Sequence, residues 1–311
     1  MRKPEGRKQA RRVARHATAG ALAGVATVMC WSAAFAQQVS LAEPAVYSTT
    51  TPAPLVVKTA PPPATSATDA ASAFDAKFNA AVTSDYNYRG YTLSNHLPSV
   101  SANAEADYNM FFGSVNVASV QMPGLSHFQM TDTLGLRRAF GALTMETGGA
   151  IYSYPGGAND PSYAEVYVSP SYAATKKLTI GLNVFYAPDY YRHGVWENYN
   201  SLTIKYDIAW GLSFSAELGR QSFGTTRATP TSPGFAFPDY SYGNAGFSYT
   251  YKSLTFDLRY HATTLSKQSC FLITGTGSAV GGSNGCAQEV TASLSWSAGW
   301  SDVKAALAGS K

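Results

Sequence analysis

The nine residues from Leu178 to Tyr186, LTIGLNVFY, decide the fold of this chain. Apolar residues hold every second position: Leu178, Ile180, Leu182, Val184 and Tyr186. A mostly polar set stands between them: Thr179, Gly181, Asn183 and Phe185. Successive side chains of a β-strand point to opposite faces, so this segment predicts a strand with one apolar and one polar face. A period of two residues excludes an α-helix here.

The same alternation recurs about a dozen times between Phe74 and Trp300. We expect strands near residues 74–88, 98–108, 111–120, 128–140, 142–154, 163–175, 178–190, 198–209, 211–223, 240–252, 254–265 and 288–300. Most of these runs are long enough to cross a bilayer, since a tilted spanning strand needs about 9–11 residues. An even number of strands places both ends of such a domain on the same, periplasmic side.

Short and long connections take turns along the chain. The short ones fall at residues 108–113, 138–142, 175–178, 208–211 and 251–253, and the long ones at 89–98, 122–127, 155–162, 188–198, 223–239 and 265–288. A soluble β-sandwich with Greek-key crossings has no reason to keep this order. A transmembrane barrel keeps this order, because all its short turns lie on one side of the membrane and all its long loops on the other. The sequence therefore predicts an all-β fold, a transmembrane antiparallel up-and-down β-barrel of about twelve strands over residues 74–300.

The residues before the barrel predict export. Seven basic residues and Glu5 give the first fifteen positions a charge of +6, so the net charge of +4 hides a slightly acidic remainder that excludes a basic nucleic-acid surface. An uncharged run ending in Ala34-Phe35-Ala36 follows, which predicts a signal peptide over residues 1–36. Residues 37–73, rich in Pro, Ala and Thr, predict a disordered periplasmic leader. Otherwise we expect an exported chain without helices and a polar tail over 301–311.

The cysteines predict one disulfide bond. Cys30 leaves with the signal peptide, so Cys270 and Cys286 are the remaining pair in an oxidising compartment, and both lie in the longest loop. No histidine stands close to them in sequence, which disfavours a metal site. We expect no metal and no cofactor.

Charged residues and one histidine hold positions of inward parity: Lys77, Glu105, Arg137, Glu146, Glu165, Lys205, Glu217, Asp257, Arg259 and His261. Because both signs are mixed, this set predicts one of two interiors. It is either a network of ion pairs that fills the barrel or a wet constriction that filters solutes by size and charge. His261 lacks the Gly-x-Ser-x-Gly turn of a serine hydrolase, so no catalytic residue is predicted.

Aromatic residues gather at the expected strand ends. One level holds Tyr186, Tyr190, Tyr191, Trp196 and Tyr199, and the other holds Phe140, Tyr206, Trp210, Tyr251 and Trp300. Aromatic girdles at both membrane interfaces are typical of outer-membrane barrels. We therefore expect both levels to lie on the outer surface.

Several strings resemble the TorF-family putative porins of proteobacteria over about residues 74–296. They are SDYNYRG at residues 84–90, SPSY at 169–172, APDY at 187–190, LTFDLRYH at 254–261 and CFL at 270–272. The resemblance implies an outer-membrane pore but supplies no substrate and no catalytic residues. The long Pro-rich leader and the residues after Trp300 depart from the family pattern.

These observations lead to an expected function. The first hypothesis is a porin in the outer membrane of a Gram-negative bacterium, which passes small hydrophilic solutes by diffusion. The alternatives are an outer-membrane enzyme that modifies lipid, and a plugged structural or receptor barrel without conductance. The expected partners are outer-membrane lipid, lipopolysaccharide and small solutes, but no nucleic acid, and a monomer is favoured over an oligomer.

Overall fold

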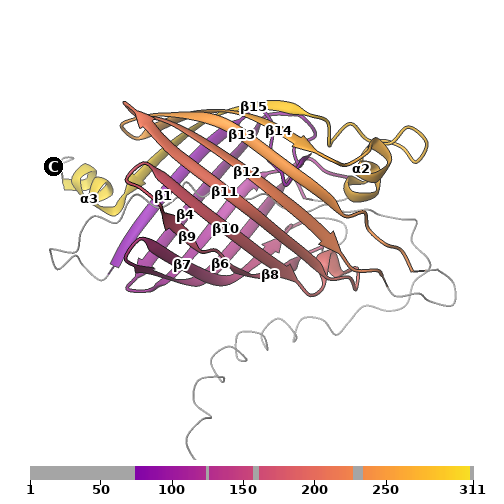
Figure 1. Ribbon diagram of the computed structural model, residues 1–311, viewed down its shortest axis with the longest axis horizontal. Coiled ribbons are helices and arrows are strands. Elements are labelled where there is room, and N and C mark those ends of the chain that lie inside the picture. Colours follow the sequence, from indigo (N-terminus) through magenta and orange to yellow (C-terminus); the bar gives the residue numbers. More distant parts are fainter. Residues whose placement is uncertain (1–73, 124–125, 157–160, 227–233, 309–311) are drawn as a thin grey trace, which may run out of the picture. The chain divides into compact units, whose positions relative to one another are not determined.

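A computed structural model describes residues 74–123, 126–156, 161–226 and 234–308, which all belong to one compact unit. The predicted signal peptide (1–36) and leader (37–73) lie outside the described residues. Figure 1 shows a single barrel wall of tilted strands. Within the described residues, no helix is both long enough and apolar enough to cross a membrane.

The wall is built from antiparallel strands that follow one another in sequence (Figure 1). They are β1 (Phe74–Thr83), β4 (Ser99–Tyr108), β5 (Phe111–Ser119), β6 (Phe128–Phe140), β7 (Leu143–Ser153), β8 (Tyr163–Val168), β9 (Ser171–Ala173), β10 (Leu178–Ala187), β11 (Glu197–Ala209), β12 (Leu212–Phe223), β13 (Tyr240–Tyr251), β14 (Leu254–Thr263) and β15 (Glu289–Gly299). The segments β8 and β9 occupy one place in the wall, because both pair with β7 and β10. The strand is interrupted between them at Pro170, which has no N–H to donate to a neighbouring strand.

The wall closes where its first and last strands pair. In β1 and β15, Lys77 lies opposite Gly299 and Thr83 lies opposite Ser293, with every residue between them in register. The other pairings join strands that are neighbours in sequence. The predicted fold, a closed up-and-down barrel of twelve strands, is confirmed.

The two ends of the barrel differ as the connection lengths predict. At the short-turn end, most strands are joined by tight turns such as the one at Trp210 and Gly211, where φ is 52° and 84°. Two consecutive positive φ values characterise the two-residue hairpin turn whose twist matches that of the flanking strands. A Cβ on Gly211 would also collide with the carbonyl oxygen of Thr250. The long-loop end carries the extended connections, including the one that holds α2.

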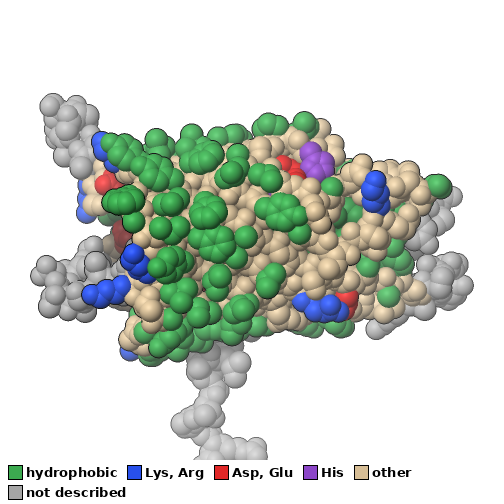
Figure 2. All heavy atoms as spheres, turned by 45° about the horizontal axis from the view of Figure 1, so that its top comes forward, with side chains coloured by type: hydrophobic (Ala, Val, Ile, Leu, Met, Phe, Trp, Pro, Cys, Tyr) green, Lys and Arg blue, Asp and Glu red, His purple; other side chains and the backbone are tan. Residues whose placement is uncertain are grey.

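The outer face of the wall is apolar. Leu182, Leu218 and Leu258 expose 52%, 69% and 48% of their surface, although each lies in the middle of a strand. Figure 2 shows hydrophobic side chains covering the wall nearer to α3, whereas the end that carries α2 is mostly polar. An apolar band around a closed barrel whose backbone groups pair within the wall is the surface that an outer membrane requires. The barrel therefore belongs to the bacterial outer membrane.

The structure corrects the expectation of a chain without helices. Helix α2 (Lys267–Thr274) lies in the longest loop and α3 (Trp300–Ala308) follows β15, so the expected tail begins as a helix. Ser266 caps α2 by accepting a hydrogen bond from the backbone N–H of Ser269 at 3.1 Å, and Gly275 ends it at a φ of 63°. A helix this short depends on its caps, which the strand pattern does not reveal.

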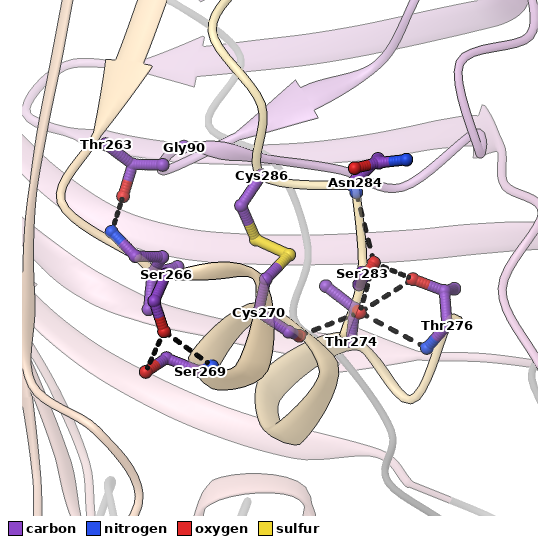
Figure 3. The surroundings of a disulfide bond; sticks show 12 residues. Gly90, Thr263, Ser266, Ser269, Cys270, Thr274, Thr276, Ser283, Asn284 and Cys286 are labelled. Carbon is purple, nitrogen blue, oxygen red and sulfur yellow. Dashed lines mark hydrogen bonds between the residues drawn. A yellow bond between two sulfur atoms is a disulfide. The ribbon is translucent and has the colours of Figure 1, made fainter. Parts of the chain in front are cut away.

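The predicted disulfide bond is confirmed between Cys270 of α2 and Cys286, whose Cα atoms are 5.8 Å apart (Figure 3). Beside it, hydroxyl groups of Thr274, Thr276 and Ser283 bond to one another, at 2.7 Å for the two pairs that Thr276 makes. The disulfide bond and this cluster fix α2 against the segment that leads into β15.

Candidate functional site: a plugged barrel interior

The segment from residue 84 to residue 98, here called the plug, follows β1 and folds into the barrel at the long-loop end. It contains a small hairpin of β2 (Asn87–Tyr88) and β3 (Tyr91–Thr92), so β1 ends at Thr83 and not at the expected residue 88. Arg89 and Gly90 form its turn, with φ values of 43° and 98°. A Cβ on Gly90 would lie 2.9 Å from the Cβ of Thr263, so only glycine fits against the wall.

Arg89 anchors the plug inside the barrel. Its guanidinium lies 3.1 Å and 3.2 Å from the carboxylate oxygens of Glu165 on β8 and 2.9 Å from Glu197 on β11. All three side chains are completely buried. Burial by itself would lower the pKa of Arg89, but the two carboxylates outweigh burial and raise it above its ordinary value. The charged form of Arg89 is therefore the buried form.

Aromatic rings surround this buried charge. The guanidinium carbon of Arg89 lies 4.2 Å from the ring centre of Tyr199 and 4.7 Å from that of Tyr88. The tyrosines of the surrounding core are Tyr88, Tyr91, Tyr152, Tyr154, Tyr163, Tyr190, Tyr191, Tyr240 and Tyr242. Plug, loops and wall all contribute to this core, so the long-loop end of the interior is packed with side chains.

Three residues predicted to form the outer aromatic girdle lie inside the barrel instead. Tyr190, Tyr191 and Tyr199 are 2%, 2% and 0% exposed, and they face the interior. The short 3-10 helix η1 (Tyr190–Arg192) turns the first two inward, and Tyr191 adopts a φ of 52° there. Tyr199 has the inward parity of Lys205, which its sequence position already indicated. By contrast, Tyr186 and Trp196 stay on the surface as expected.

The short-turn end of the interior is wetter and strongly charged. The Lys77 amine lies 2.6 Å from Asp107 and 3.3 Å from Glu105, while 47% of the Lys77 side chain remains exposed. Arg137 contacts Glu105 at 2.9 Å, Asp107 at 3.0 Å and Glu146 at 2.8 Å. This end therefore has a mixed-charge mouth that water reaches.

A third group of polar side chains lies along β12, β13 and β14. Arg259 donates to Asp257 at 2.9 Å and to Asn244 at 2.6 Å. Glu217 accepts from Asn244 at 3.1 Å and, at 2.8 Å, from the hydroxyl of Tyr199. Asn244 also donates to the Tyr242 hydroxyl at 2.6 Å, so this hydrogen-bonded group reaches the tyrosine core around the plug.

His261 lies beside this group on β14. One ring nitrogen lies 3.2 Å from the Tyr242 hydroxyl and the other lies 3.0 Å from the Thr291 hydroxyl. Both ring nitrogens are thus engaged with neutral hydroxyls of the wall, and the ring is 6% exposed.

The structure places all ten predicted inward residues on one face of the wall. Strand pairing puts them at positions that lie opposite one another, as Lys77 does with Glu105, Arg137 with Glu146 and His261 with Glu289. Lys205 pairs separately with Asp207 at 3.2 Å. Sequence reasoning missed Arg89 and Glu197, since the first lies in a loop and the second just before the expected start of its strand.

The structure resembles solved outer-membrane porins at low sequence identity. The KdgM porin matches with a TM-score of 0.44 and 10% identity, over 71% of this chain and 98% of that one. The NanC porin gives 0.43 and 12% over 71% and 97%, and OpdK from Pseudomonas aeruginosa gives 0.35 and 14% over 65% and 58%. At these identities function does not transfer, so it must come from this chain's own side chains.

The comparison with curated proteins found no match. The narrower resemblance to TorF-family putative porins stays a prediction. A family model matches residues 67–297, which include the whole wall of the barrel except its last residues. The chain belongs to this family, described as bacterial protein of unknown function (Gcw_chp).

Proposed function

We propose that this protein is a porin-type channel for small hydrophilic solutes, closed at its outer end by the plug in the conformation described here. One observation carries the proposal. Arg89 is fully buried against Glu165 and Glu197 at the long-loop end, whereas Lys77 at the short-turn end is 47% exposed. The interior is therefore open to solvent at the short-turn end and closed to it around Arg89.

The size of the barrel supports a removable plug. Eight-stranded barrels are filled by wall side chains and sixteen-stranded barrels leave a channel, so a barrel of twelve strands needs additional chain to fill its interior. Here the plug and η1 supply that chain. Without the plug, the long-loop end of the interior would lose this filling.

The chemistry that holds the plug also favours a gate over a permanent filling. A buried ion pair often stabilises less than well-packed apolar side chains of the same volume would, because desolvation offsets the attraction. It does impose specific geometry. The triad of Arg89, Glu165 and Glu197 therefore positions the plug without the larger stabilisation that a purely apolar contact would give.

An open channel would select solutes by size and local charge. Arg259, Asp257 and Glu217 lie on the inner face between the plug and the mouth, and both signs are present. Small polar solutes fit this lining better than apolar ones, which would have to desolvate the charges. The partners of the outer surface are lipid and lipopolysaccharide, and a monomer suffices for this mechanism.

The rival functions draw less support from the side chains. A lipid-modifying enzyme needs its catalytic groups at the lipid interface, and His261 faces the interior between two neutral hydroxyls. A structural or receptor barrel would use the same plug, but it would gain nothing from a charged, exposed mouth. Conductance separates these possibilities.

The test is single-channel recording in a planar bilayer. In the test variant, a short Gly-Ser linker replaces residues 86–95. In the matched control, the same linker replaces residues 278–282, an exposed tip of the α2 loop. We expect rare openings for the wild type and the control, and a sustained ion current for the plug variant.

Two outcomes would count against the proposal. If the plug variant folds, as judged by its heat-modifiable mobility in gels and its circular dichroism, but stays silent, the barrel is structural. If the wild type already conducts as well as the plug variant, the channel stands but the plug does not close it.

A further inference from the structure

Three side chains with metal-ligating atoms meet at the outer rim of the barrel. The Nδ1 atom of His96 lies 2.8 Å from Oδ2 of Asp85 and 3.2 Å from Oε2 of Glu289. All three atoms lie within 4.8 Å of one another. Asp85 and His96 belong to the plug, and Glu289 is the first residue of β15. Two segments far apart in the sequence therefore build one cluster.

The ring of His96 turns its Nδ1 atom towards this cluster. Its other ring nitrogen, Nε2, lies 3.3 Å from the backbone carbonyl oxygen of Asn284. A carbonyl oxygen only accepts, so Nε2 carries the hydrogen in the neutral ring. Nδ1 is therefore the ring nitrogen that faces both carboxylate oxygens, where it can bind either a proton or a metal ion.

Hydrogen bonds to the atoms that face away from the cluster also hold each side chain in place. The second oxygen of Asp85, Oδ1, accepts hydrogen bonds from the hydroxyls of Thr92 at 2.5 Å and Ser94 at 2.6 Å. The second oxygen of Glu289, Oε1, accepts from the side-chain amide of Asn87 at 2.6 Å. Metal-binding histidines and carboxylates characteristically have such partners on their outer atoms. The remaining atoms, Oδ2, Oε2 and Nδ1, face one another.

We propose that Asp85, His96 and Glu289 form a binding site for a divalent transition-metal ion, with Zn²⁺ the best fit. Imidazole nitrogen with carboxylate oxygen suits zinc, whereas calcium and magnesium prefer oxygen alone. Ligand atoms about 2.0 Å from a tetrahedral ion lie about 3.3 Å apart, close to the two separations measured here. The exposed side of His96 leaves room for water as the fourth ligand.

The charge of the cluster suits a divalent ion. The ion pairs found for Asp85 and Glu289 among the described residues both involve His96. A protonated His96 would balance one carboxylate. A divalent cation bound to neutral His96 would balance both carboxylates. The site does not depend on whether the barrel conducts.

The test is zinc binding to the full barrel in detergent. Protein stripped with a chelator is titrated with ZnCl₂ in competition with a chromophoric zinc indicator. We expect one ion for each barrel. His96→Ala and Glu289→Gln should each weaken binding at least about 100-fold, since each removes a direct ligand. Thr92→Val keeps all three ligands but loses a supporting hydroxyl, and it should weaken binding by about 10- to 100-fold.

His127→Ala is the matched control, because His127 is an exposed histidine in another loop of the same end. It should bind zinc as the wild type does. Cobalt(II) should give the intense visible absorption of tetrahedral coordination in the wild type, and His96→Ala should lose it. CaCl₂ alone should not compete.

Three results would overturn the proposal. In the first, wild-type protein binds no zinc, and the cluster is then an ion pair of protonated His96. In the second, His96→Ala binds zinc as tightly as the wild type while heat-modifiable mobility shows that it is folded. In the third, calcium binds in preference to zinc.

Discussion

Replacing Arg89 by methionine tests what holds the plug in the barrel. Methionine fills a similar volume without charge, so the change removes the contacts of 2.9–3.2 Å to Glu165 and Glu197. Both carboxylates stay buried without a cation. Removing one partner of a buried ion pair costs about 3–5 kcal/mol. At about 1.4 kcal/mol for each factor of ten, the docked plug should become about 100- to 4000-fold less favoured over the undocked one.

Amide hydrogen exchange measures the equilibrium between the docked and the undocked plug. The backbone N–H of Thr92 donates to the carbonyl of Gly285 at 2.8 Å, and that of Leu93 donates to the carbonyl of Tyr86 at 2.7 Å. Both bonds depend on a docked, folded plug. In Arg89→Met their protection should fall by about 100- to 4000-fold, while amides between β12 and β13 keep theirs.

A charge-balanced variant supplies the control. Arg89→Met combined with Glu165→Gln and Glu197→Gln removes both signs, and it should recover most of the lost protection because no buried charge is left unpaired. Wild-type protection in the single variant would refute the reasoning. A combined variant as labile as the single one would show that shape and not charge balance holds the plug.

The remaining predictions concern the wall, the loop and the lining. Leu182→Arg should reduce folding stability in liposomes by about 2–4 kcal/mol more than Asn183→Arg, because the first faces lipid and the second the interior; equal losses would contradict these faces. Replacing Cys270 and Cys286 by serine should destabilise the α2 loop by about 3 kcal/mol, seen as faster limited proteolysis of that loop than in the wild type, and unchanged proteolysis would show that the disulfide bond does not limit loop opening. In the plug-shortened barrel, Arg259→Gln should shift the reversal potential under a salt gradient towards cation preference, whereas an unchanged potential would place the pore elsewhere.

The wall of the barrel could be predicted because its signal is local. Leu182 and Asn183 are adjacent in sequence and face opposite sides, and this parity needs no knowledge of distant residues. The predicted strand over 128–140 coincides with β6. The prediction overran β1, since the residues after Thr83 keep an extended pattern while they turn into the barrel.

The plug and its anchor could not be predicted in the same way. Arg89 meets partners that lie 76 and 108 residues away, and no periodicity of the sequence reports such a distance. The parity of Tyr199 correctly indicates the interior. The girdle prediction relied instead on its place near a strand end, where aromatic residues are abundant. The cluster of His96 and Glu289 joins residues 193 apart, so only the closed barrel brings it together.

The position of the plug directly after β1 has a consequence for the order of assembly. One edge of β1 pairs with β4, its neighbour in the chain, and the other edge pairs with β15. The plug that follows β1 docks against Glu165 on β8 and Glu197 on β11. Contacts so distant in sequence form late, because the intervening chain must first be ordered. We therefore expect the edge of β1 that pairs with β4 to form before the seam, and the seam and the docked plug to form late in folding.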